Sequence, residues 1–193
     1  MPEERTAPSA RHAELLEAAY RYALENGLAD LSLRPLAAAI GSSPRVLIFL
    51  FGSKEGLVRA LLTRAREDER ALLDGAAGGD PVGLADAARQ VWSWLVEPER
   101  RPLLRLWVEG YARSLVDSDG AWAGFGTDTV EDWLTLLARH QPEGERSTPE
   151  GAARRTAVLA VLRGALLDLL ATGQEARVGA AVELQLDLLD SRA

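Results

Sequence analysis

Apolar residues recur at every third or fourth position along most of the chain, which is the spacing of amphipathic helices. The pattern predicts helices over about 12–25, 33–40, 44–51, 53–73, 84–95, 103–111, 150–171 and 174–189. One more helix begins between Gly120 and Asp128, where glycines at positions 124 and 126 weaken its first part. No strand-like alternation and no repeat interrupts the series. The sequence therefore predicts an all-α fold.

The pattern of apolar, cap and turn residues in 32–57 predicts two short helices joined by a tight turn and followed by a third helix. Ser32 stands where a helix N-cap belongs, and Gly41 lies in the turn. Ser43 followed by Pro44 marks the start of the second helix, because proline is favoured at the first helical position. A helix, a turn containing glycine and a compact second helix form a helix-turn-helix unit, whose second helix enters the major groove of DNA.

Short segments in and before this unit occur in an ordered series. They are Leu15-Leu16-Glu17-Ala18-Ala19, Glu25-Asn26-Gly27, Ser32-Leu33-Arg34, Leu36-Ala37, Ile40-Gly41, Ser43, Leu47 and Phe51-Gly52-Ser53-Lys54-Glu55-Gly56-Leu57. With this series the chain resembles the tetracycline-repressor (TetR) family of bacterial transcription regulators. The resemblance covers roughly the first third of the chain. It implies a helix-turn-helix DNA-binding domain at 1–56 and an all-helical effector-binding and dimerisation domain at 57–193.

The resemblance also implies which side chains meet DNA: the second helix faces base edges, and flanking residues hold phosphates. Carried across position by position, the DNA-binding set is Arg34, Ser43, Pro44, Arg45, Val46, Ile48, Phe49 and Lys54. Arg45 is the only residue on this helix that can pair bidentately with guanine. Lys54 is the only lysine in the chain and falls where a phosphate contact is expected. The alternative for these basic side chains is a solvated charged surface.

The second helix departs from the family pattern because residues 46–51 are all apolar. The family usually has a hydroxyl-bearing aromatic residue at the position of Ile48 and a polar residue at Phe49 or Leu50. A short helix cannot bury every side, so we expect Ile48 or Phe49 to be exposed. Two accounts of these groups compete. In the first, they press on thymine methyls and sugars of the operator. In the second, the head has lost ordinary operator recognition, or it packs against something else.

The net charge of −7 is distributed unevenly along the chain. Residues 1–60 carry seven basic and seven acidic side chains, so the whole excess of negative charge lies in residues 61–193. A neutral head in front of an acidic body discourages unspecific binding to DNA. We therefore expect weak unspecific DNA binding and an affinity that depends on two heads acting together.

All five tryptophans lie beyond residue 91, in the predicted body. Aromatic walls with a few polar groups are typical of small-molecule cavities, and the family binds an effector in its helical body. The candidate ligand-binding residues are Trp92, Trp107, Tyr111, Trp122, Phe125, Trp133 and Arg163. Trp122, Phe125 and Trp133 share a face only if their helix is continuous. The alternatives are core packing for the aromatic residues and, for Arg163, an ion pair near a subunit interface rather than an anionic ligand.

The last two predicted helices carry apolar stripes, and the family pairs two such helices from each subunit in a four-helix bundle. The candidate interface residues are Val158, Leu162, Ala165, Leu166, Leu169, Val178, Val182, Gln185 and Leu189. Two heads related by a twofold axis would read half-sites about one DNA turn apart. The helix that starts at Ser53 is the expected lever between effector and head.

Catalysis is not expected from this sequence. The two histidines, His12 and His140, suggest neither a metal pair nor a catalytic triad, and Glu67-Asp68-Glu69 resembles exposed helix surface. The absence of cysteine excludes disulfides and thiolate metal sites, so no cofactor or metal is expected. With no apolar run of about 20 residues and no secretory signal, we expect a cytoplasmic protein.

The sequence thus favours a ligand-responsive transcription regulator. We expect a repressor that binds a palindromic operator as a homodimer and is released by an unknown small-molecule effector. The alternative is a helical small-molecule-binding or protein-interaction module whose DNA recognition is degenerate.

Overall fold

The computed structural model describes residues 10–76, 81–117 and 119–190, except the side chains at 72–74, 76 and 190. The helices are α1 (Ala10–Asn26), α2 (Leu33–Ala39), α3 (Pro44–Phe51), α4 (Lys54–Ala76), α5 (Leu84–Leu95), the 3-10 turn η1 (Pro98–Arg100), α6 (Arg101–Val116), α7 (Phe125–Arg139), α8 (Glu143–Arg146), α9 (Pro149–Thr172) and α10 (Glu175–Asp190). No strand occurs within these ranges, which confirms the predicted all-α fold. Among the described residues no single helix is both long and apolar enough to cross a membrane. Only the combined length and composition of α2 and α3, which are bent by 102° relative to each other, would suffice.

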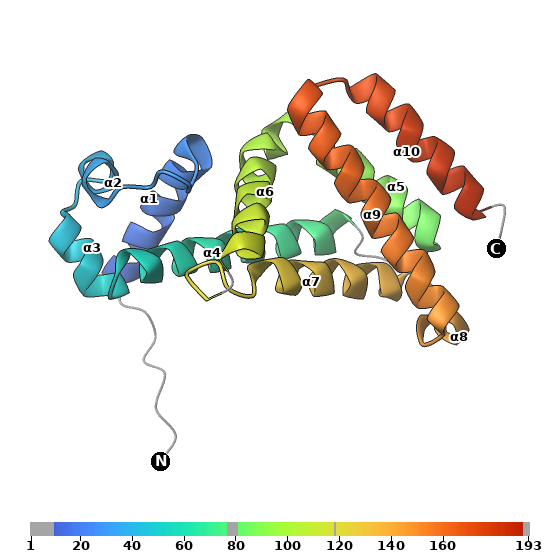
Figure 1. Ribbon diagram of the computed structural model, residues 1–193, viewed down its shortest axis with the longest axis horizontal. Coiled ribbons are helices and arrows are strands. Elements are labelled where there is room, and N and C mark those ends of the chain that lie inside the picture. The colour runs from blue at the N-terminus through green and yellow to red at the C-terminus, as the bar shows by residue number, and fades with distance from the viewer. Residues whose placement is uncertain (1–9, 77–80, 118, 191–193) are drawn as a thin grey trace, which may run out of the picture.

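The head consists of α1, α2, α3 and the first turns of α4 (Figure 1). Its core is made by one apolar face of each helix, including Ala19 of α1, Leu36 of α2, Leu47 of α3 and Leu57 of α4, all of which are fully buried. Side chains three and four positions apart lie on the same face of a helix, so the sequence pattern translates directly into this packing.

Helix α4 belongs to both the head and the body. It packs against α1 and α3 near its start and against α5, α6 and α7 further along. Leu61 and Ala65 continue its buried face beyond the head. Figure 1 shows α4 running from the head under α6 and alongside α7, so the two parts share one continuous helix.

The body is formed by α5 to α10 together with the rest of α4. The hairpin of α9 and α10 lies at the far end from the head and packs on α5 (Figure 1). Gly173, which ends α9 with a positive φ, reverses the chain direction between the two helices. The predicted break near Gly173 is confirmed.

Helix α7 starts at Phe125, inside the predicted range of 120–128, because Gly124 adopts the left-handed conformation with φ of 78° and interrupts any longer helix. Trp122 therefore lies outside α7 and does not share its face. Between α7 and α9 the chain also forms the one-turn helix α8, which the apolar pattern did not predict.

One hydrogen bond ties the head to the body outside α4. Glu109 of α6 accepts from the backbone N–H of Leu28, between α1 and α2, with N and Oε2 2.9 Å apart. Gly27 makes this approach possible: its φ is 77°, and a Cβ there would lie only 3.1 Å from the same carboxylate oxygen. We call this contact the Glu109 latch.

Candidate DNA-binding helix and effector cluster

Helix α3 is short, and both of its ends are set by local sequence. Ser43 caps the start: its Oγ accepts from the backbone N–H of Val46 at 3.3 Å, and Pro44 occupies the first helical position. Gly52 follows the last residue with a φ of 77°. The predicted cap at Ser43 is confirmed, whereas Ser32 occupies the N-cap position of α2 without a side-chain hydrogen bond.

One face of α3 is anchored and the opposite face is exposed. Leu47 is fully buried in the head, whereas Val46 is 38% exposed, Ile48 39% and Phe49 85%. Arg45 is exposed beside them. The structure confirms that a six-residue apolar run on so short a helix leaves large side chains in solvent. Exposed groups of this size are unusual enough on a small domain to mark a contact surface.

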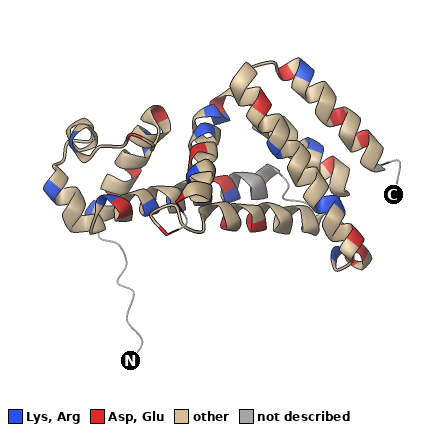
Figure 2. Ribbon diagram, in the orientation of Figure 1, with Lys and Arg blue, Asp and Glu red and all other residues tan. Residues whose placement is uncertain are grey.

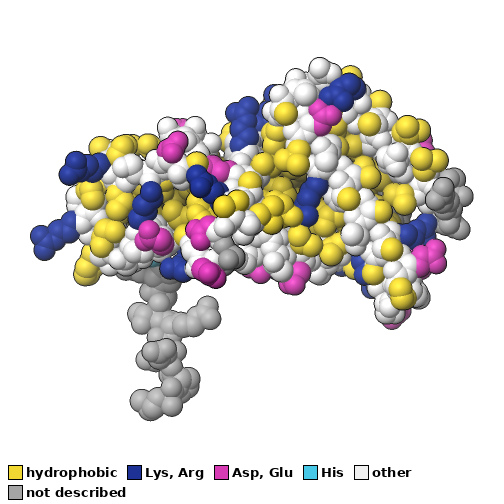
Figure 3. All heavy atoms as spheres, in the orientation of Figure 1, with side chains coloured by type: hydrophobic (Ala, Val, Ile, Leu, Met, Phe, Trp, Pro, Cys, Tyr) yellow, Lys and Arg dark blue, Asp and Glu magenta, His cyan; other side chains and the backbone are white. Residues whose placement is uncertain are grey.

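Basic side chains border the exposed face of α3. Arg34 on α2 and Lys54 at the start of α4 are both exposed. Figure 2 shows basic residues on α2, α3 and the beginning of α4, and Figure 3 shows Lys and Arg side chains projecting at this end of the molecule. This end can therefore offer both cationic groups and apolar surface to a partner.

In the body, helices α6 and α9 contribute to a stack of aromatic and guanidinium groups. Trp107 and Tyr111 of α6 are stacked, with ring centroids 5.3 Å apart. The Arg163 guanidinium of α9 lies 5.6 Å from the Trp107 centroid and 4.8 Å from that of Tyr111. Arg163 Nη1 also donates to the Tyr111 hydroxyl at 3.3 Å. Trp133 of α7 joins them through Glu69.

Glu69 of α4 is buried beside this stack and is only 5% exposed. The Trp133 indole N–H donates to Glu69 Oε1 at 2.7 Å. Burial raises the pKa of Glu69 to about 8; the Trp133 hydrogen bond opposes the rise and the charge of Asp132 adds to it. The charge of Arg163 also opposes it. We call Glu69, Trp107, Tyr111, Trp133 and Arg163 the effector cluster.

The effector cluster contains more hydrogen-bond donors than acceptors. Arg163 Nε, Arg163 Nη2 and Trp107 Nε1 are buried and have no acceptor among the described residues. A buried donor left without a partner costs about 1–3 kcal/mol. Buried polar groups in native proteins are nearly always paired, so this clustering calls for an explanation.

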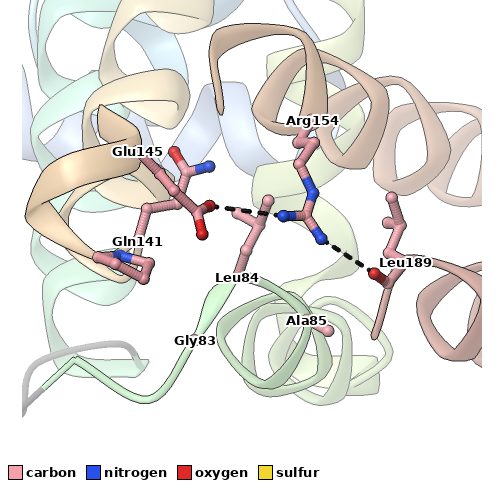
Figure 4. Close-up of a pocket in the computed structure, with 8 residues that line it drawn as sticks. Gly83, Leu84, Ala85, Gln141, Glu145, Arg154 and Leu189 are labelled. Carbon is pink, nitrogen blue, oxygen red and sulfur yellow. Dashed lines mark hydrogen bonds and ion pairs between the residues drawn. The ribbon is translucent and has the colours of Figure 1, made fainter. Parts of the chain in front are cut away.

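A separate pocket of about 160 Å³ lies near the end of α10 (Figure 4). Arg154 points into it, paired with Glu145 at 3.5 Å and donating to the Leu189 carbonyl at 3.1 Å. Its charged group already has partners on both sides, so Arg154 bridges the pocket between α8 and α10, and the start of α5 lines the pocket as well. In the described ranges, no three histidine or acidic side chains gather as metal ligands do.

Comparisons with known proteins agree with this arrangement. Residues 15–61 match the family model for bacterial regulatory proteins of the tetR family. The TetR-family regulator from Cytophaga hutchinsonii has a similar fold over 98% of both chains, with a TM-score of 0.79 and 17% identity. Residues 15–61 therefore match the helix-turn-helix DNA-binding head of the TetR regulators, and the fold of the whole chain is the one that solved members of this family have.

Two further solved structures extend the comparison. A transcriptional regulator from Rhodococcus sp. Rha1 is similar over 92% of this chain and 94% of its own, with a TM-score of 0.74 and 23% identity. The multidrug binding protein EbrR, solved with proflavin, is 26% identical over 91% of this chain and 99% of its own, with a TM-score of 0.68. No curated protein matches the chain. The fold of this chain is therefore shared with these regulators along nearly its whole length.

Not all of the residues expected to line an effector site come together in the structure. Trp107, Tyr111, Trp133 and Arg163 do. Phe125 packs beside Gly110 of α6 and borders a neighbouring pocket of about 160 Å³ with Arg66 and Asp128, among others.

Two tryptophans lie elsewhere. Trp92 faces α10, where a Cβ on Gly179 would lie 3.5 Å from its Nε1. Trp122 borders a pocket of about 210 Å³ between head and body, with Leu28, Lys54 and Arg113 among its other lining residues.

Glu69 is the residue that the sequence interpretation missed. The run Glu67-Asp68-Glu69 was expected to be exposed helix surface, and this is wrong for Glu69. Glu69 lies four residues after Ala65 and eight after Leu61, so it continues the buried stripe of α4. Periodicity alone contains this signal, but a carboxylate on a buried stripe is uncommon.

The stripe expected to form the dimer interface faces inward. Its fully or almost fully buried members are Val158, Leu162, Leu166, Leu169, Val178 and Val182. Ala165 and Leu189 are half-buried and Gln185 is exposed. The buried members fill the core of one chain and have no surface left for a partner. The outward faces of α9 and α10 carry Leu167, Leu184 and Leu188 instead.

Proposed function

We propose that this TetR-family regulator is a repressor that binds a palindromic operator as a homodimer and releases it when a small-molecule effector occupies the body. The domain boundary would fall after residue 56, just inside α4. The observation that carries the proposal is α3, a capped helix anchored by Leu47 that presents Arg45, Ile48 and Phe49 outward. A helix held in this way is suited to enter the major groove.

The proposed DNA contacts are of two kinds. Exposed Phe49 and Ile48, with Val46 and Pro44, would press on thymine methyls and sugars, and Arg45 would pair with a guanine. Arg34, Ser43 and Lys54 would hold phosphates and fix the orientation of the head.

The proposed dimer interface is the outward face of α9 and α10. Leu184 is 61% exposed, and Leu167 and Leu188 are also exposed. Figure 3 shows hydrophobic side chains gathered over this end of the molecule. Pairing two copies through this face would form a four-helix bundle at the far end of the body from the heads.

The proposed effector site is the effector cluster. Its residues come from α4, α6, α7 and α9, and α4 and α6 both reach the head. A ligand that shifts either helix changes the separation of the two heads, and coupling of this kind is typically worth about 1–3 kcal/mol. EbrR, which is similar in fold, was solved with proflavin.

The test uses fluorescence anisotropy with DNA fragments that flank the gene. We expect salt-sensitive binding to one palindromic site with two subunits per site. Phe49→Ala and Ile48→Ala should each weaken specific binding by about tenfold, because each removes apolar contact with base methyls. Binding to an unrelated fragment should change little in either variant, since both groups read sequence rather than phosphate charge.

A second candidate function is favoured by the apolar character of α3. A helical small-molecule-binding or protein-interaction module with degenerate DNA recognition would also expose Ile48 and Phe49. In that case binding to DNA would be weak and indifferent to sequence, and both alanine variants would leave it unchanged.

A further inference from the structure

The guanidinium of Arg163 is only partly used within the chain. Nη1 donates to the Tyr111 hydroxyl at 3.3 Å. Nε and Nη2, which form the edge that pairs with a carboxylate through two parallel hydrogen bonds, are buried and have no acceptor in the part of the chain that the structure describes. The unused edge is therefore the one that bidentate recognition requires.

The charge of Arg163 is also uncompensated at neutral pH. Within the described ranges Arg163 forms no ion pair, and arginine remains charged throughout the physiological range. Glu69 is the carboxyl group whose charge acts on it, but burial raises the pKa of Glu69 to about 8. Arg66, another cation near Glu69, is already paired with Asp128 and Asp132 at 2.5 Å each. The effector cluster thus holds one net positive charge.

The surroundings of the unused edge are aromatic. Trp107 and Tyr111 stack against the guanidinium. Trp107 Nε1 is a third buried donor without an acceptor. A ligand that fits must bring acceptor oxygens and one negative charge, together with an apolar body. A cation such as proflavin has no acceptor oxygen and no negative charge, and the guanidinium would repel it.

We infer that the effector of this protein is an aromatic or similarly flat monocarboxylate, held by Arg163 through Nε and Nη2. This inference rests on the proposed function, since it names the class of ligand for the effector site. Charge-assisted bidentate pairing is stronger and more directional than a neutral hydrogen bond.

The experiment is isothermal titration calorimetry on the full chain with matched pairs of probes. The pairs are benzoate with benzamide and 2-naphthoate with 2-naphthamide, and proflavin is the cationic comparison. We expect at least one carboxylate to bind about tenfold or more tightly than its amide. Arg163→Gln should abolish this preference while leaving the amide affinity nearly unchanged.

The control is Arg105→Gln, which removes an exposed arginine from α6, the same helix that carries Trp107 and Tyr111. It should keep the full preference. If circular dichroism shows that Arg163→Gln does not fold, Arg163→Lys is used in its place to test the preference for a carboxylate. It retains the charge but loses the planar fork, so the preference should fall several-fold.

Equal binding of each carboxylate and its amide would overturn the inference and leave the effector site standing. The inference would also be overturned if the Arg163 variants, which lack the guanidinium, kept the full preference for a carboxylate over its amide. Tighter binding of proflavin than of either carboxylate would overturn it as well. A partner subunit's carboxylate already seated on Arg163 would produce the first of these results. If no probe bound or changed the tryptophan fluorescence, both the inference and the proposed effector site would fail.

Discussion

At the scale of single residues, the exposed side chains of α3 were easier to predict from the sequence than the buried carboxyl group of Glu69. The exposure of Ile48 or Phe49 could be predicted, because a short helix cannot bury every side of a six-residue apolar run, and Leu47 takes the fully buried position. The burial of Glu69 could not, because a carboxyl group is placed in a core by its partners, which here lie 64 residues away at Trp133. The spacing places Glu69 on the buried stripe of α4, but it does not reveal the long-range partner that allows a carboxyl group to stay there.

Glu69 makes a prediction about the pH dependence of stability. Its folded-state pKa of about 8 lies above the ordinary value of about 4.3, so the folded chain holds a proton that the unfolded chain releases in that interval. The contribution of Glu69 to stability is therefore complete below about pH 4 and is lost as the pH rises towards 8.

Glu69→Gln should reduce this loss, because the amide keeps the shape and does not ionise. We expect the difference in unfolding free energy between variant and wild type to shift in favour of the variant by on the order of 2 kcal/mol between pH 5 and pH 8.5. Urea unfolding at fixed protein concentration measures it. A difference that stays constant over this range would show that Glu69 titrates normally.

At the scale of elements, periodicity placed the long helices well, because each buries at least one apolar face. It left the start of α7 open between residues 120 and 128, and the left-handed conformation of Gly124 fixes that start at Phe125. Periodicity failed on α9, which has apolar residues on both faces, Leu162 inward and Leu167 outward. Sequence spacing cannot tell which of two apolar faces meets the core of its own chain.

The Glu109 latch joins the α1–α2 connection to α6, the helix that carries Trp107 and Tyr111. Glu109→Ala should weaken operator binding several-fold, because a freer head loses more orientational entropy when it docks. The variant should also respond less to effector, since one of the links from α6 to the head is gone. Anisotropy titrations with and without effector measure both effects.

The matched control is Glu131→Ala, which removes an exposed carboxylate on α7 that is remote from the Leu28 amide. It should preserve operator affinity and effector response. If Glu109→Ala behaves like this control in both titrations, the latch has no part in signalling.

At the scale of the whole molecule, the heads and the proposed pairing surface lie at opposite ends of an elongated chain (Figure 1). A small rotation about the pairing surface is therefore amplified at the heads by the length of the body. Such amplification suits a regulator that must change the spacing of two reading helices by a few ångströms. The sequence predicted the head, but it did not predict how far the head lies from the outward face of α9 and α10.

Leu184→Asp tests the pairing surface. A charge placed in an apolar interface loses its water on assembly, so we expect the variant to be monomeric at concentrations where the wild type is a dimer. Its operator affinity should fall in step, because one head alone binds weakly. Analytical ultracentrifugation measures the first effect and anisotropy the second.

Leu115→Asp is the control, because Leu115 is 70% exposed but lies at the end of α6. It should remain a dimer. A wild-type chain that sediments as a monomer at micromolar concentration would refute the proposed dimer directly.

The solitary lysine has a practical consequence. Because Lys54 is exposed at the first residue of α4, amine-directed reagents have one side-chain target, and it lies at the rim of the reading helix. A fluorophore attached to Lys54 would report whether α3 occupies the major groove of DNA, and no residue would have to be substituted to attach it. Bound operator should protect this amine from acylation, so mass spectrometry of labelled peptides would give a footprint with a single informative peak.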